Sequence, residues 1–156
     1  RGNTHIVLGA AWGWRMLSPR WRDLWGGDMD THDLPLDYNA PQMNKAVIIM
    51  TDGDNTIDSN NKGGYGYLSE GRLGTTNQST AESRLDSRLG TVCTRMKNNN
   101  IIVYTVSFGS ISTSSQTMLR NCATAPEYYF NSPSDAALAT AFQAIGDSLS
   151  NLRISK

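Results

Sequence analysis

The sequence predicts an α/β fold, a parallel sheet flanked by helices, from the pattern of its apolar residues. Two unbroken apolar runs, Ala46–Met50 and Ile101–Val106, are rich in β-branched residues, as expected of strands covered on both faces. Between them, apolar residues recur at helical steps in a helix expected from about Thr80 to Lys97. Because a strand, a helix and a strand in this order form a β-α-β unit, the two strands are predicted to run parallel.

The part of the chain before the first strand is predicted to contain one helix. Apolar residues from Ile6 to Leu17 permit a helix that Pro19 ends, because proline restricts the residue before it. Two irregular insertions are expected, at about 19–44 and 53–79, since neither segment is periodic. Loops of this length in a compact domain usually carry function or are mobile.

Three elements are expected after the second strand. Ser114–Cys122 is long enough for a short helix, and Tyr128–Phe130 for a short third strand. Ser132 is predicted to be the N-cap of a C-terminal helix, with Pro133 at its first position. Leu138 and later apolar residues follow at helical spacing, so this helix is expected to dock on the sheet.

Length and charge limit the range of functions. The 156 residues are too few for two cores, so residues 1–156 are taken as one domain. Fourteen basic and fourteen acidic residues give a net charge of zero, which leaves no overall field to attract nucleic acid or an anionic membrane. No apolar run approaches the roughly 20 residues that cross a bilayer. Neutral polar residues dominate the remainder, a composition typical of extracytoplasmic proteins.

The acids that follow the first strand are the best candidates for a functional site. Asp52 comes directly after the strand ending in Met50 and Thr51, and Gly53 follows it. Open α/β sheets bind their ligands at the carboxyl ends of the strands. Asp52 is therefore expected to face a ligand rather than only to cap a loop, and Asp54 is a candidate accessory acid.

Six blocks of the sequence, spread over the whole chain with long variable gaps, together resemble one family. Trp12–Trp14 followed by Leu17–Pro19 is the most specific part, because a Thr-Asp-Gly turn after an apolar strand is common. The family is the von Willebrand factor A-like fold, and more closely the TadG-like proteins of Tad/Flp pilus assembly. The blocks are Gly2–Ile6, Ala10–Pro19, Met50–Gly53, Ile102–Val106, Leu119–Ala123 and Phe142–Arg153.

This resemblance implies a Rossmann-type three-layer fold that apparently lacks its N-terminal strands, and a metal-ion-dependent adhesion site. In A-like domains, three loops hold the ion: an Asp-x-Ser-x-Ser loop, a loop with a threonine, and the aspartate of the Thr-Asp-Gly turn. Thr4 and Asp52 match the second and third loops, and Mg²⁺ suits their hard oxygens. The Asp-x-Ser-x-Ser loop does not occur in this sequence and is expected upstream of Arg1. This chain alone is therefore expected to bind Mg²⁺, or another divalent cation, weakly or not at all.

The resemblance also implies a function: a protein-binding and assembly module of a bacterial Tad/Flp pilus biogenesis or adhesion system, and not an enzyme. Its expected partners are proteins of the pilus-assembly machinery. The implied location is the periplasm, with an inner-membrane anchor upstream of this sequence. Without the N-terminal strands, the apolar edge of the strand at 45–50 is expected to be covered by an upstream fragment, a second copy or the segment Gly2–Pro19.

An enzyme is the alternative interpretation of the same residues. Asp52–Thr56 also resembles the nucleophile turn of haloacid-dehalogenase-like phosphatases, in which Asp52 would attack phosphorus and Asp54 would act as acid and base. Gly146–Ser148 resembles the late magnesium motif of those enzymes. That motif must end a strand, whereas periodicity places Asp147 on the exposed side of a helix, so the binding module is favoured.

Cys93 and Cys122 are predicted to form a disulfide. Two successive right-handed crossovers that extend a sheet in one direction place both connecting helices side by side on the same face. Each cysteine lies on one of these helices. A disulfide is favoured over two buried thiols because the polar composition points to an oxidising compartment.

All four tryptophans lie within the first 25 residues. Trp12 or Trp14 is expected behind the sheet, because large aromatic side chains are mostly buried. Trp21 and Trp25 are expected to pack against the long loop. The functional alternative is an aromatic surface for a protein partner.

Overall fold

The fold is built on a parallel sheet of three strands in the order β1, β2, β3. The structure, a computed structural model, describes the backbone of residues 2–154 and the side chains of residues 2–151. Lys45 of β1 (Lys45–Thr51) lies opposite Ile101 of β2 (Ile101–Phe108), and Thr105 lies opposite Tyr129 of β3 (Tyr129–Ser132). The predicted α/β class with a parallel sheet is therefore confirmed.

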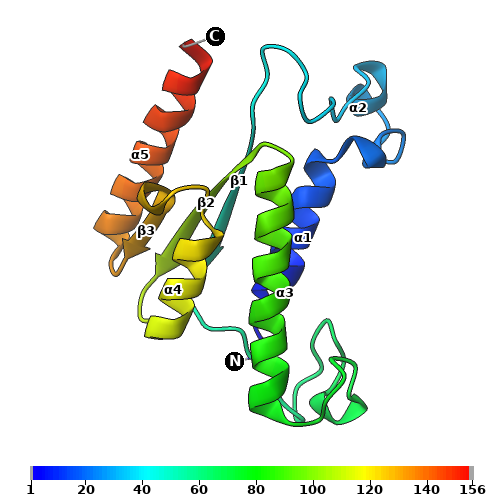
Figure 1. Cartoon of the computed structure of the whole chain (residues 1–156), viewed down its shortest axis with the longest axis vertical. Coiled ribbons are helices and arrows are strands. Elements are labelled where there is room, and N and C mark those ends of the chain that lie inside the picture. The colour runs from blue at the N-terminus through cyan, green and yellow to red at the C-terminus, as the bar shows by residue number, and fades with distance from the viewer. Residues whose placement is uncertain (1, 155–156) are drawn as a thin grey trace.

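Helices cover the sheet on two faces (Figure 1). Three helices share one face: α1 (Ile6–Leu17), α3 (Gln78–Asn98) and α4 (Thr113–Cys122), with α3 between the other two. α5 (Asp135–Ile154) packs on the other face, against β2 and β3. Short helices lie in the connections: η1 (Pro19–Trp21), α2 (Asp28–Thr31), η2 (Leu68–Glu70) and η3 (Pro126–Tyr128). Within residues 2–154, no helix combines the length and apolarity needed to span a bilayer.

The larger part of the core lies between the sheet and the α1–α3–α4 layer. Of the apolar stripe predicted for α3, Leu85, Leu89 and Met96 have no exposed surface, and Val92 is partly buried. Val103 of β2 meets this stripe, and Ala10 of α1 joins it from the side. The strands also turn buried polar side chains to this face, and these are bonded: the Thr105 hydroxyl donates to the Leu119 carbonyl of α4 at 2.9 Å.

A smaller cluster holds α5 to the opposite face. Tyr104, Val106 and Ile145 are its buried members, and the Tyr104 hydroxyl lies 2.8 Å from the Ser148 hydroxyl. α5 contacts β2 and β3, and on this same face of β1 the side chains of Ile48 and Met50 are exposed. Among the described residues, the second face of the sheet is therefore covered on the β3 side and open on the β1 side.

Helix ends agree with the prediction except at the C-terminal helix. α1 has the predicted bounds, and α3 begins near the predicted residue because the Asn77 side chain accepts a hydrogen bond from the Thr80 amide. The prediction that Ser132 is an N-cap was wrong. Ser132 ends β3, where its carbonyl accepts from Gly109, and Ser134 accepts from Ala137 two residues later. Pairing with β2 therefore extends the strand past the expected boundary.

The predicted disulfide is present. Cys93 of α3 and Cys122 of α4 are bonded, with their Cα atoms 5.2 Å apart. The two helices lie side by side on one face of the sheet, as two right-handed crossovers require. The bond ties the end of α4 to the C-terminal half of α3.

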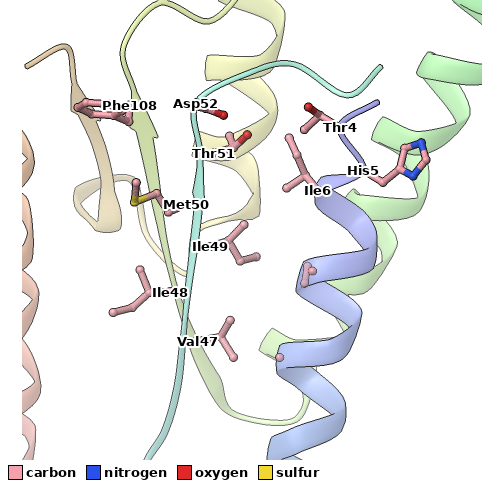
Figure 2. A pocket seen from close by; sticks show the side chains of 13 residues that line it. Thr4, His5, Ile6, Val47, Ile48, Ile49, Met50, Thr51, Asp52 and Phe108 are labelled. Carbon is pink, nitrogen blue, oxygen red and sulfur yellow. The ribbon is translucent and has the colours of Figure 1, made fainter. Parts of the chain in front are cut away.

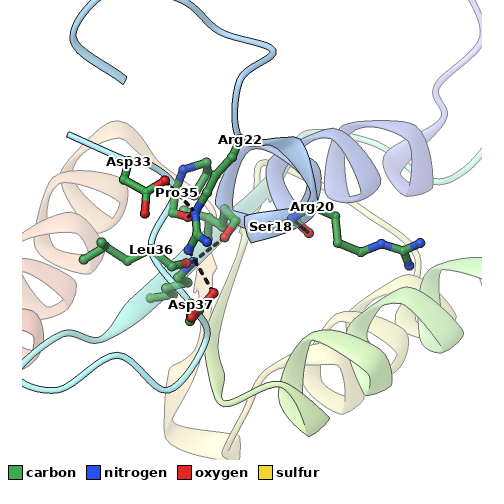
Figure 3. Close-up of polar contacts among 9 residues, drawn as sticks. Ser18, Arg20, Arg22, Asp33, Pro35, Leu36 and Asp37 are labelled. Carbon is green, nitrogen blue, oxygen red and sulfur yellow. Dashed lines mark hydrogen bonds and ion pairs between the residues drawn. The ribbon is translucent and has the colours of Figure 1, made fainter. Parts of the chain in front are cut away.

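The connection between α1 and β1 contains no strand but is held by polar contacts. Lys45 is buried, and its ammonium group donates to the Leu17 and Leu36 carbonyls. Burial lowers the pKa of Lys45, the nearby Arg22 lowers it further, and Asp37 opposes both. Arg22 itself bonds the Pro35 carbonyl and pairs with Asp37 at 2.8 Å (Figure 3). A lysine next to the last carbonyl of α1 is well placed, because helix C-termini favour positive charge.

The connection between β1 and α3 is packed, although it is irregular. Its apolar residues Ile57, Leu68 and Leu73 are buried and belong to the main core. Gly63 and Gly66 form a tight antiparallel bridge. Three buried side chains explain how a long segment without strands keeps a fixed position.

Candidate functional site

The segment before α1 and the loop after β1 are joined by several hydrogen bonds. The Thr4 amide donates to the Thr56 hydroxyl, and the Thr56 amide donates to the Thr4 carbonyl, both at 2.9 Å. The buried Asn55 accepts from the Ile6 amide at 2.9 Å. These bonds satisfy amides at the start of α1 and bring residues about fifty positions apart to one end of the sheet.

Thr4 and Asp52 lie at this end and line the same pocket, a volume of about 470 Å³. Figure 2 shows the two side chains at the carboxyl end of β1 and the start of α1. Within residues 2–154, neither the Asp52 carboxylate nor the Thr4 hydroxyl forms a hydrogen bond or an ion pair. Two oxygen donors without partners therefore face one space, where open α/β sheets place their ligands.

Asp54 lies in the same pocket but is already engaged. One of its carboxylate oxygens accepts from the Ser112 amide at 3.1 Å and from the Ser112 hydroxyl at 2.9 Å. Partial burial raises the pKa of Asp54, but hydrogen bonds from Ser115 and Ser112 outweigh it and hold the pKa below its usual value. Asp54 thus fastens the β1 loop to the start of α4, and it stays ionised there.

Asn55, whose role was not predicted from the sequence, is a positioning residue of the site. While its side-chain oxygen holds α1, its amide group donates to Asp86 of α3 at 2.8 Å. One side chain therefore links β1, α1 and α3. An asparagine in a polar loop gives no sequence signal for this role, because its partners are distant in the chain.

A larger apolar groove of about 710 Å³ adjoins the site and runs between α1 and β1. Figure 2 shows Val47 and Ile49 pointing toward α1, while Ile48 and Met50 point away from it. All four residues line the groove, which therefore wraps around the edge of β1. The free backbone edge of β1 lies along it, since β2 is the strand that pairs with β1.

His5 lies at the end of this groove, and its ring packs against Tyr65 and Gly63. The ring contacts Tyr65 edge-on at 5.3 Å, and a Cβ at Gly63 would lie 2.3 Å from it. Its Nε2 is buried, with no hydrogen-bond partner among the described residues. Burial lowers the pKa of His5, and a backbone hydrogen bond to Thr56 opposes it in part. The neutral imidazole is therefore favoured, and only glycine at position 63 leaves room for it.

The side-chain oxygens of the site are of the type that a hard cation binds, but they are too few to fill its coordination shell. Carboxylate and hydroxyl oxygens suit Mg²⁺, which normally has six ligands including waters. Thr4 and Asp52 supply two oxygens, and one oxygen of Asp54 is taken by Ser112. In the part of the chain that the structure describes, no group of three His, Cys, Asp or Glu residues could hold a metal ion. Any ion bound here would need most of its ligands from water or from a partner.

The residues of the alternative phosphatase motif are not brought together as that chemistry requires. Gly146–Ser148 lies inside α5 rather than at the end of a strand. Asp147 is exposed, and Ser148 is occupied by Tyr104. α5 packs on the face of the sheet opposite α1, so Asp147 is not positioned as a ligand beside Asp52.

Three of the four tryptophans are partly buried, and Trp12 is exposed. Trp14 packs against the main core and donates to the Tyr38 hydroxyl at 2.9 Å, as expected for one of the first two tryptophans. Trp21 and Trp25 stack on each other at 5.7 Å and are half-buried. Trp12 is 49% exposed and meets Trp21 edge-on.

No protein-family model, curated protein or solved structure matches this chain. A functional assignment therefore depends on the geometry of the chain itself.

Proposed function

We propose that this chain is a protein-binding module of the bacterial cell envelope, related to the A-like domains of Tad/Flp pilus-assembly proteins. Thr4 and Asp52 bind a partner protein through a shared divalent cation. The observation that carries the proposal is that these two residues, which the family's motif selects, line one pocket with side-chain oxygens that have no hydrogen-bond or ion-pair partner among the described residues.

The neighbouring contacts support this role. Asn55 and Thr56 hold the Thr4 segment in place, and Ser112 holds the Asp54 loop. The pocket is therefore fixed by hydrogen bonds that do not use Thr4 Oγ1 or the Asp52 carboxylate. A preformed pair of ligands reduces the entropy lost when an ion binds.

The shortage of protein ligands explains why a partner is needed. A divalent cation supplies an electrophilic centre that accepts a further carboxylate. Thr4 and Asp52 orient the ion, and a partner's Asp or Glu completes the shell. Binding of the ion by the isolated chain is expected to be weak, and binding of ion and partner together is expected to be cooperative.

Paramagnetic broadening of NMR signals by Mn²⁺ tests the site directly. In the ¹⁵N-labelled chain, Mn²⁺ is expected to broaden the amide signals of residues 2–4 and 52–54 before others. Asp52→Asn should abolish this selective broadening, and Thr4→Val should weaken it. Asp28→Asn, which changes an exposed acid in α2, is the matched control and should leave it unchanged. Uniform broadening, or selective broadening that survives Asp52→Asn, would contradict the proposal.

The partner is tested by crosslinking from the rim of the pocket. Ser110 is exposed and lines the pocket, so a photoreactive residue there should crosslink to proteins of the pilus-assembly machinery in bacteria that make such pili. Asp52→Asn and EDTA should both lower the yield. Crosslinks unaffected by either treatment would show that the cation site does not bind the partner.

A further inference from the structure

A second cleft lies at the other end of α1, away from the Thr4–Asp52 pocket. It has a volume of about 510 Å³ and is bounded by α1, η1, α3 and the loop around Tyr38. Seven positions separate Thr4 from Ala11, the first residue of α1 that lines the cleft, a rise of about 10 Å at 1.5 Å per residue. Ala11 and Val92 form an apolar floor between α1 and α3. We call this region the arginine cleft.

The walls of the arginine cleft are basic and aromatic. Arg15 and Arg20 line it, together with Trp14, Trp21 and Tyr38. Among the residues that the structure describes, neither arginine pairs with a carboxylate, and none of the lining residues is acidic. In Figure 3, Arg22 bonds Asp37 and Pro35, whereas the Arg20 side chain points away from that cluster.

The aromatic side chains hold one of the arginines in position. The Arg15 guanidinium lies 5.0 Å from the Trp12 ring and 5.6 Å from the Trp21 ring. Cation–π contacts of this kind restrain the guanidinium while leaving its N–H donors available. Arg88 of α3 lies over the Tyr65 ring instead and does not line the cleft. The positive charge that lines the cleft is therefore that of Arg15 and Arg20, in a chain whose net charge is zero.

A long polyanion is not the expected ligand. The segment that follows the cleft, residues 23–37, carries five aspartates, so the positive region is small and acidic groups lie beyond it. Nucleic acid would meet repulsion there. Two separate guanidinium groups over an apolar floor suit a short ligand with two carboxylates and an apolar group between them.

From this charge complementarity we propose that the arginine cleft binds a short acidic segment of a partner protein. An apolar side chain of that segment packs on Ala11 and Val92, and flanking Asp or Glu carboxylates pair with Arg15 and Arg20. Arginine and tryptophan are the residue types that contribute most to protein interfaces, and arginine binds carboxylates through two parallel hydrogen bonds. This second site is independent of the cation site at Thr4 and Asp52.

A pair of synthetic peptides tests the proposal. The probe is acetyl-Glu-Glu-Leu-Glu-Glu-amide, and the control replaces each Glu with Gln. Binding is followed by the intrinsic tryptophan fluorescence of the whole chain, since Trp14 and Trp21 line the cleft. We expect saturable binding of the Glu peptide that weakens at higher salt, and much weaker binding of the Gln peptide.

Variants locate the binding site. The double variant Arg15→Gln/Arg20→Gln should weaken binding at least about tenfold. Both residues are exposed, so the fold should persist, which circular dichroism checks. Arg120→Gln is the matched control, because Arg120 is an exposed arginine on α4 that also contacts an aromatic ring. Its affinity should equal that of the unaltered chain.

Three results would overturn the proposal. The first is equal affinity of the double variant and the unaltered chain. The second is equal or tighter binding of a pentanucleotide of single-stranded DNA, which would indicate a general anion site. The third is loss of peptide binding in Asp52→Asn or with EDTA, which would place the peptide at the cation site instead. Failure of the Mn²⁺ experiment would leave the arginine cleft unaffected.

Discussion

The two sides of the central strand β2 differ in how fully helices and strands cover them. On one side, β3 pairs with β2, α4 and α5 cover the two faces, and the Cys93–Cys122 bond links α4 to α3. On the other side, α1 covers one face of β1. Within the described residues, the opposite face of β1 and its outer backbone edge have no cover.

This difference shows that a strand's sequence and its burial are separate properties. β1 and β2 have the same unbroken apolar pattern, but β2 is almost fully buried whereas Ile48 and Met50 of β1 are 39% and 46% exposed. The β3 side of the sheet, which we call the closed side, is expected to contribute most of the stability of the fold. The β1 side, which we call the open side, carries the groove and the Thr4–Asp52 pocket and is expected to contribute most of the partner binding.

Removal of the disulfide should have the largest effect. Cys93→Ala/Cys122→Ala frees a loop between residues 29 positions apart, which is expected to cost about 3.5 kcal/mol of unfolding free energy by the chain-entropy relation. Urea denaturation of the oxidised chain and the double variant measures this difference. A change below about 1 kcal/mol would mean that packing alone holds α4 to α3.

A pair of matched isoleucines compares the two sides directly. Ile145 on the closed side is 1% exposed and Ile48 on the open side is 39% exposed. Ile145→Ala should therefore cost about 3 kcal/mol, with a cavity left in the core, and Ile48→Ala about 1 kcal/mol or less. Equal losses in urea denaturation would show that the open side is covered in solution.

The free edge of β1 should promote association. Apolar strand edges recruit other strands, and lysine on an edge strand prevents this. Light scattering of the chain at rising concentration should show mass above 17.1 kDa, and Ile48→Lys should return it toward the monomer. Leu24→Lys, a change at an exposed leucine outside the sheet, is the control and should not. A monomer at every concentration would contradict the prediction.

The smallest expected effect is a pH dependence at His5. Burial lowers the pKa of His5 in the folded chain, while the unfolded chain takes up its proton near pH 6.5. The folded state then binds fewer protons, so stability falls as the pH drops below about 6.5 and stops falling below the folded pKa. His5→Gln should flatten this part of the stability profile, and His32→Gln, at an exposed histidine, should not. A profile unchanged by His5→Gln would assign the effect to other groups.

Local patterns in the sequence predicted β1, β2, β3 and the long helices α1, α3, α4 and α5 in their order, but not the short helices in the two long connections. Helical spacing defined α1 and the buried stripe of α3, and two apolar runs defined β1 and β2. The handedness of the crossovers predicted that the two cysteine-bearing helices lie side by side, and the polar composition favoured a Cys93–Cys122 bond over two free thiols. These features depend on backbone geometry and nearest neighbours, which a single sequence expresses directly.

Only the tertiary structure decided what surrounds each element. The sequence could not place the N-cap of α5, because pairing with β2 draws Ser132 into β3. It could not identify Asn55 or the arginine cleft, whose parts come from distant segments. It also could not tell that β1 has one open face, because apolar residues show that a strand can be buried, whereas its exposure depends on which neighbours lie beside it.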